Sequence, residues 1–277
     1  MKGNSKSPAI SSSNERIRFL RDEFERLLPP LPCKKMVWQR EQQKQIRILK
    51  ATLIHEQFFY VADLREGKLK NVNFIEKWLG YPDQDFTIEK FMSLIHPSQQ
   101  LAFKLLSYNL AIYLLGGKMK LQFMVQYFIF HVALRHIKGH YLLFKRVTYP
   151  FQFTDKNQLL EYLTVFTLLG GYQNTPFYFR ASDQNGDLLD MHLTIIENMQ
   201  TQFKSLRVFS TQEWRILTRY AKDININIAM LSQAFQVKES TIKEYNKRIK
   251  EKASNIFERQ FTSTREVAAW LAYQGIL

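Results

Sequence analysis

Cysteine and glycine are scarce in this sequence, which has one cysteine and ten glycines in 277 residues. The single thiol, Cys33, can form neither an internal disulfide nor a thiolate metal site by itself. The scattered glycines form no phosphate-binding loop, no dinucleotide fingerprint and no nucleophile elbow. We therefore expect no catalytic residue and no enzyme activity.

Long apolar runs are also lacking. No stretch approaches the roughly 20 apolar residues of a membrane span, and the N-terminus lacks the apolar core of a secretory signal. We expect a cytoplasmic protein that makes no membrane contact.

The six histidines show no spacing that is typical of a metal site. His136 and His140 are four residues apart, but they lie in a predicted strand and turn, where this spacing is expected to keep them apart. His96 precedes Pro97 and is expected to break a helix rather than to bind haem. We expect neither a metal nor a cofactor.

Positive charge is abundant, with a net charge of +14, and it is concentrated at the two ends. Residues 1–50 contain 12 Lys and Arg against 5 Asp and Glu, and residues 201–277 contain 13 against 7, whereas residues 51–200 are nearly neutral. Basic ends favour a polyanionic partner, because phosphate contacts release counterions. Charge alone is equally consistent with a solvated basic surface. The hydrophobic content of 45% indicates a folded chain, and its length suits two domains.

Two helices are predicted in an N-terminal segment, residues 1–56. The first follows the capping residues 11–14 and ends at Pro29-Pro30. Its apolar stripe, which we expect to mediate dimerisation, consists of Ile17, Leu20, Phe24 and Leu27. The second spans about 37–54, and its narrow stripe, suited to pairing with another helix, consists of Trp38, Ile46, Leu49 and Leu53.

From residue 58 the pattern changes to short aromatic and β-branched runs around a helical block, which predicts an α+β fold. The predicted strands are 58–62, 68–72, 119–135, 140–154 and 159–169. The predicted helices are 74–79 and 87–115, the second interrupted at His96-Pro97. An additional hairpin is predicted to turn at 184–187. The long strands are too continuously hydrophobic for an exposed face, so we expect them to lie against helices or a partner.

Residues 57–170 resemble a PAS sensory domain in the order of their short motifs. The matching residues are Asn73, Trp78-Leu79-Gly80-Tyr81, 91–95 before His96-Pro97, and 135–141 opening a strand that ends near Pro150. The chain departs from the pattern at Ser98 and Gln99, where acidic residues are usual. The resemblance implies an antiparallel sheet with flanking helices and a role in sensing or dimerisation, and we assign residues 57–193 to this domain. We expect the interior to be crowded by Phe123, Tyr127, Phe144, Phe166 and their neighbours, so any pocket should be apolar and small. Its ligand is unknown.

A linker helix at about 194–206 leads into an all-α segment of four predicted helices, residues 207–277. The first begins at Ser210, which offers an N-cap hydroxyl before an acidic first turn, and it breaks at 223–225. The remaining three are predicted at 226–235, 239–253 and 263–274.

This segment resembles the helix-turn-helix domain of the LuxR and FixJ regulators. The matching residues are Ser210, Glu213, Ile216, Leu217, Ala221, Leu231, Phe235, Val237, Ser240, Thr241, Ile242, Lys243, Ile249 and Lys252. The chain departs from that family at 223–225, which lacks glycine and has about two additional residues, and at Tyr245, where a histidine is usual.

The resemblance implies that the helix from residue 239 enters the major groove of double-stranded DNA, with Ile242, Ile249 and Ala253 facing inward. Lys243 and Lys247 are one turn apart and can face the same groove. A solvated helix face is the alternative for these cations. The candidate DNA-binding residues are Lys238, Glu239, Ser240, Thr241, Lys243, Glu244, Tyr245, Lys247 and Arg248.

The sequence thus predicts a bacterial one-component transcription regulator that binds DNA as a homodimer. The alternative is an interaction module whose helices contact RNA polymerase or another regulator without specific DNA binding. A ligand-gated enzyme domain has no nucleophile or acid and base pair in its favour. The operator, the ligand and the direction of regulation stay open, and the last helix, with Val267, Trp270 and Leu271, is a second candidate for the dimer interface.

Overall fold

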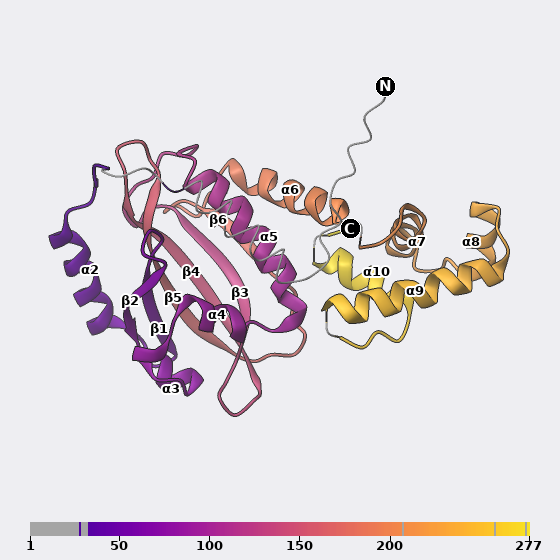
Figure 1. Ribbon diagram of the computed structural model, residues 1–277, viewed down its shortest axis with the longest axis horizontal. Coiled ribbons are helices and arrows are strands. Elements are labelled where there is room, and N and C mark those ends of the chain that lie inside the picture. The colour runs from indigo at the N-terminus through magenta and orange to yellow at the C-terminus, as the bar shows by residue number, and fades with distance from the viewer. Residues whose placement is uncertain (1–27, 29–32, 207, 258, 275) are drawn as a thin grey trace, which may run out of the picture.

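The computed structural model describes residues 28, 33–206, 208–257, 259–274 and 276–277. The helix predicted to follow residues 11–14, and with it the stripe proposed for dimerisation, lies outside the described residues. Figure 1 shows a sheet with helices against it and, at the C-terminal end, a second group made only of helices.

A six-stranded antiparallel sheet forms the larger part of the molecule, which confirms the predicted α+β fold class for this region. Its strand order is β2-β1-β5-β4-β3-β6, so β1 pairs with the distant β5 in the middle of the sheet. The strands are β1 Gln57–Asp63, β2 Lys68–Asn73, β3 Tyr127–Arg135, β4 Tyr141–Phe153, β5 Leu159–Gly171 and β6 Phe179–Ser182.

One strand prediction needs correction. Residues 119–126 do not extend β3, because the Gln126 side chain accepts a hydrogen bond from the Gln122 amide (2.9 Å) and donates one to the Lys120 carbonyl (3.3 Å), which folds the segment into a turn. The additional hairpin predicted to turn at 184–187 is present, because Ser182 bridges Leu188 across the turn. Its first strand, β6, also pairs with β3 at the edge of the sheet.

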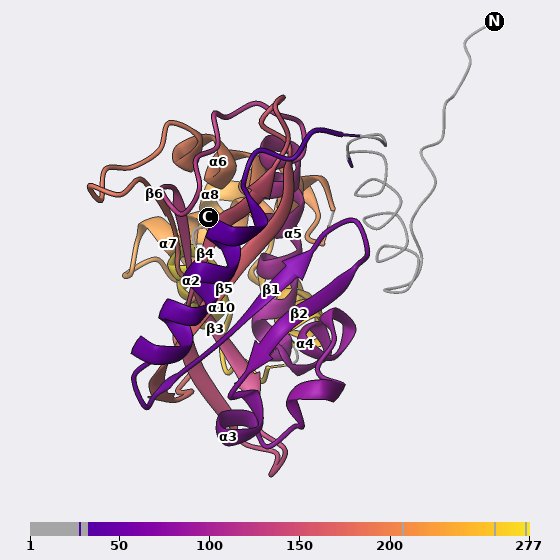
Figure 2. The ribbon, with the colours of Figure 1, turned by 90° about the vertical axis from the view of Figure 1, so that its left-hand side faces the viewer.

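Helices cover both faces of the sheet, which explains its continuous hydrophobicity. Alternate residues of β1 point to opposite faces: Phe58 and Tyr60 pack toward the helices that follow β2, whereas Phe59 and Val61 pack under the preceding helix α2. Figure 2 shows α2 lying over the sheet. The helices are α2 Gln39–Thr52, α3 Ile75–Leu79, the 3-10 turn η1 Asp83–Asp85, α4 Ile88–Leu94, α5 Pro97–Leu114 and α6 Met191–Ser205.

The prediction that the stripe of α2 pairs with another helix is wrong. Ile46, Leu49 and Leu53 pack on the sheet instead, and Trp38 is 78% exposed at the N-cap. The sequence shows the width of the stripe, but it does not show whether a helix or a sheet covers it.

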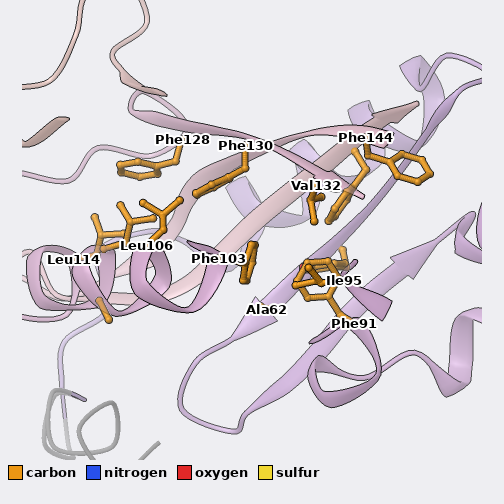
Figure 3. Packing of buried hydrophobic residues seen from close by; sticks show 14 of the residues in the cluster. Ala62, Phe91, Ile95, Phe103, Leu106, Leu114, Phe128, Phe130, Val132 and Phe144 are labelled. Carbon is orange, nitrogen blue, oxygen red and sulfur yellow. The ribbon is translucent and has the colours of Figure 1, made fainter. Parts of the chain in front are cut away.

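The main core lies between the sheet and helices α3 to α5. Phe58 stacks on Phe166 with ring centroids 4.4 Å apart, and Phe144 packs beside them. Figure 3 shows side chains of α5, among them Phe103, facing Phe130 of β3. Two of the aromatics expected to crowd this interior are only half-buried: Phe123 packs on Phe151 toward α2, and Tyr127 lies beside Tyr149.

The histidine predictions have different outcomes. His96 caps α5, its Nδ1 accepting from the Ser98 amide at 3.2 Å with Pro97 in the first turn, so the predicted helix break is present. The expectation that His136 and His140 lie apart is wrong, because the β3-β4 hairpin stacks their rings 4.6 Å apart. Within the described part of the chain, no group of three or more His, Cys, Asp or Glu could hold a metal ion.

The C-terminal helices form a second core around Leu217, Leu231, Ile242 and Ile249, all fully buried. Their bounds are α7 Thr211–Lys222, α8 Ile228–Phe235, α9 Glu239–Phe257 and α10 Thr264–Tyr273. Among the helices that the structure describes, none has the length and apolar character needed to cross a membrane.

The second candidate for the dimer interface is wrong for the three residues named. Val267, Trp270 and Leu271 are 0%, 7% and 0% exposed, because they belong to the core that joins α10 to α7 and α9. An interface made of these side chains would require this core to open.

Candidate nucleic-acid interface

Helix α8 is held at both ends by side-chain contacts. The Asn227 side chain accepts a hydrogen bond from the Met230 amide at 2.9 Å, which satisfies one of the free donors at the N-terminus of a helix. At the other end Gln236 takes a left-handed conformation with φ of 54°, and the Ser232 hydroxyl donates to the Val237 carbonyl at 2.6 Å. Three residues, 236–238, therefore separate α8 from α9.

The Asn227 cap provides a test of this local structure. Asn227→Ala should lower the free energy of unfolding by about 1 kcal/mol, whereas Asn227→Ser, which keeps a capping oxygen, should retain most of it. Urea unfolding followed by the fluorescence of Trp214 and Trp270 would measure both variants. Equal destabilisation by alanine and serine would show that the cap does not hold α8.

One side of α9 is anchored and the opposite side is open. Ile242, Ile249 and Ala253 are 0% exposed in the C-terminal core, as expected from their spacing. Ser240, Lys243 and the residues one turn later lie on the other side of the same helix. The exposed candidate residues are Lys238, Glu239, Ser240, Lys243, Glu244, Lys247 and Arg248.

Two candidate residues are not fully exposed. Thr241 is half-buried in the first turn of α9, and Tyr245 is half-buried because its ring packs against the core. The guanidinium of Arg248 lies 4.8 Å from the Tyr245 ring centroid, and its Nε is 4.0 Å from a carboxylate oxygen of Glu213. Arg248 thus lies at the margin of the open side, beside α7.

Glu213 fastens α7 to α9 and was not among the candidate site residues. Its side chain is 2% exposed, accepts from the Ser210 amide at 2.7 Å and receives the Lys252 ammonium at 2.6 Å. Burial raises the pKa of this carboxyl, but the hydrogen bonds from Lys252 and Ser210 outweigh burial, so its pKa lies below the ordinary value. The sequence did contain a signal for the position of Glu213, because Ser210 followed three residues later by Glu213 is the pattern of a capping box, and the structure forms that box.

Lys243 and Lys247 are the cations most available on the open side. Lys247 is 4.0 Å from Glu251, but both side chains are well exposed, and a surface pair of this kind contributes little. Sequence reasoning missed two further guanidinium groups beside α8. Arg215 lies 5.0 Å from the Phe235 ring centroid, and Arg265 donates to the Ile226 carbonyl at 2.6 Å. Only the fold brings these residues of α7 and α10 to α8.

No protein family matches this chain, and no curated protein matches it. Among solved structures, it is similar to the N-terminal domain of a diguanylate cyclase with a PAS/PAC sensor from Marinobacter aquaeolei, at 14% identity and a TM-score of 0.33, over 41% of this chain and 95% of that one. It is also similar to the phage VqmA in complex with DPO, at 9% identity and a TM-score of 0.30, over 86% of this chain and 92% of that one.

Proposed function

We propose that this chain is a bacterial, cytoplasmic DNA-binding transcription regulator of the LuxR type. In this proposal α8 and α9 form the helix-turn-helix, and α9 reads the major groove with the residues named above. The main support for this proposal is the arrangement of α9. Ile242 and Ile249 are buried and fix the helix, whereas Lys243 and Lys247 are exposed on the opposite side. Such a helix can enter the groove and hold phosphates without unfolding its own domain.

The domain of residues 57–193, which contains the sheet and helices α3 to α5, supplies the regulatory input in this proposal. Residues 194–206 link it to the DNA-binding segment, 207–277. Two helices belong to both cores. On α5, Phe103 packs toward the sheet and Leu105 toward the C-terminal helices. On α6, Ile195 packs toward the sheet and Phe203 toward the C-terminal helices. The Asn109 side chain of α5 donates to that of Gln202 on α6 at 2.8 Å. A conformational change between the sheet and α5 would therefore be transmitted through α5 and α6 to the packing of the DNA-binding helices.

The dependence of binding on salt tests this function. We expect the chain to bind duplex DNA, with an affinity that falls steeply as salt rises, because each phosphate contact releases counterions. Fluorescence anisotropy of labelled promoter and random duplexes between 50 and 200 mM salt would measure it. Absence of DNA binding, together with salt-insensitive capture of RNA polymerase, would favour the interaction module instead.

We further propose a homodimer, because helix-turn-helix proteins read two half-sites with two copies. The stripe that includes Leu20 and Phe24 is the proposed interface, so Leu20→Asp with Phe24→Asp should give a monomer of 33.0 kDa. Light scattering after size exclusion would measure the mass, with Ile48→Asp, at a 43% exposed position on α2, as the control. A double variant that keeps twice the monomer mass would rule out this interface.

A further inference from the structure

A cavity of about 380 Å³ lies between α5 and strands β3, β4 and β5. Most of its lining is apolar, and Phe91 of α4, Leu114 of α5 and Phe128 of β3 contribute to it. It reaches the surface at Gly67 and Ser107, which are exposed. A volume of this size is in the range of small-molecule sites. Phe144 and Phe166, two of the aromatics expected to crowd the interior, are fully buried in the main core but are not among the lining residues.

Arg146 of β4 is the unexpected member of the lining. It is 6% exposed, and its Nε has no hydrogen-bond partner. No carboxylate among the described residues forms an ion pair with it. Five aromatic rings surround the guanidinium carbon, with centroids 5.1 to 5.9 Å away: Phe91, Phe103, Phe130, Tyr162 and Phe166. Figure 3 labels three of these rings, Phe91, Phe103 and Phe130, in the core between the helices and the sheet.

In the part of the chain that the structure describes, no neighbouring group supplies the missing negative charge. Tyr60 lies beside Arg146, but burial raises the pKa of its hydroxyl far above the ordinary value, more than the arginine lowers it, so the phenol stays neutral. Aromatic faces stabilise a desolvated cation, but a charge moved from water into an apolar interior is still costly unless it is paired. Arg146 is therefore a buried cation that an anion would stabilise.

A second cation lines the same cavity. Lys104 of α5 is half-buried, and burial lowers the pKa of its ammonium. The described residues that line the cavity include no aspartate and no glutamate, so their charged groups, Arg146 and Lys104, are both positive. An apolar space with two cations and no acid is matched by a molecule with an apolar body and one anionic group.

We propose that this cavity binds an amphiphilic carboxylate, with the apolar body between α5 and the sheet and the carboxylate on Arg146. The planar guanidinium matches a carboxylate through two parallel hydrogen bonds. Phosphate sites commonly add backbone amides at a helix N-terminus, whereas the backbone of β4 is paired on both sides in the sheet. The inference rests on the sensory role proposed above and assigns it a ligand class.

Calorimetric titration of the full chain with carboxylates and their alcohols tests this ligand class. The pairs are dodecanoate with dodecanol and naphthalene-2-carboxylate with naphthalene-2-methanol, which separate straight-chain from aryl bodies. We expect one carboxylate to bind about 10- to 100-fold more tightly than its alcohol, which is the range for a hydrogen-bonded charged pair. Equal affinity within both pairs, or failure of both carboxylates to bind the folded protein, would overturn the proposal.

Substitutions of the two cavity cations test where the carboxylate of the ligand binds. Arg146→Gln should remove the preference for the acid over the alcohol, and Arg146→Lys should keep part of it. Arg135→Gln, at an exposed strand position, is the matched control and should change nothing. Lys104→Gln, at a half-exposed position, should reduce the preference even if Arg146→Gln does not fold. A preference that persists unchanged in folded Arg146→Gln and Lys104→Gln would place the anion elsewhere. The titration contains no DNA, so its outcome is independent of DNA binding. A chain that does not bind DNA would contradict the proposed function, but it would not contradict carboxylate binding in this cavity.

Discussion

Replacing Lys243 and Lys247 together by alanine is expected to weaken DNA binding more than any other pair of substitutions on the surface. Each lysine that contacts a base should contribute roughly 1 to 3 kcal/mol, which corresponds to about 5- to 150-fold in affinity. A lysine that contacts only phosphate should weaken all sequences alike and reduce the salt slope by about one. Both side chains are exposed, so folding should be unaffected.

Fluorescence anisotropy on promoter and random duplexes, with circular dichroism as the folding check, would measure this effect. The matched control is Lys44→Ala with Lys50→Ala, which removes the same charge from exposed positions on α2. The control variant should bind nearly as tightly as the parent. If the α9 variant is folded and binds DNA as tightly as the control does, then α9 is not the reading helix.

The second large effect is expected at the contact between Glu213 and Lys252. Lys252→Met should destabilise the C-terminal helices by about 1 to 3 kcal/mol, because a carboxylate that is 2% exposed loses its closest charged partner. The Ser210 amide and the more distant Arg248 remain and limit the loss. Urea unfolding at neutral pH would measure it, with Lys250→Met on the same helix as the control. Equal stability of the two variants would show that the contact contributes nothing.

The same contact predicts how stability depends on pH. The pKa of Glu213 is lower in the folded than in the unfolded chain, so its contribution is fully present above the unfolded value of roughly 4.3 and is lost as the pH falls through the folded value. Glu213→Gln should flatten this acid loss. Lys252→Met should move the loss to higher pH, because burial then raises the carboxyl pKa with less opposition. Acid unfolding curves that are unchanged in both variants would contradict this assignment.

Several parts of the fold could be predicted from local pattern. The consecutive aromatic residues Phe58, Phe59 and Tyr60 predicted a strand, and in the structure they point alternately to its two covered faces. Pro97 marked the start of α5, since a proline fits the first turn of a helix and not its interior. The spacing of Ile242 and Ile249 separated the buried side of α9 from its exposed side, so the exposure of Lys243 and Lys247 was also predictable.

Other parts of the candidate site depend on residues far apart in the chain. Arg248 looked as available as Lys247, but the fold places it beside Tyr245 and the carboxylate of Glu213 on α7. Arg215 and Arg265 were not candidates, because only the packing of α7 and α10 brings them next to α8. The resemblance to known helix-turn-helix proteins emphasised α9 and therefore missed both.

The sequence by itself determined the periodicity of each segment, the caps that start helices and the side of α9 that stays in water, since these depend on neighbours within a few residues. The tertiary structure alone decided what each apolar stripe packs against, so the stripe of α2 lies on the sheet and that of α10 is buried in a core. It also placed Arg146, which looks like an ordinary basic residue in the pattern of its strand, among five aromatic rings. No carboxylate of the described residues forms an ion pair with it. The physical reason is that burial and ion pairing are set by contacts across elements, which no local spacing encodes.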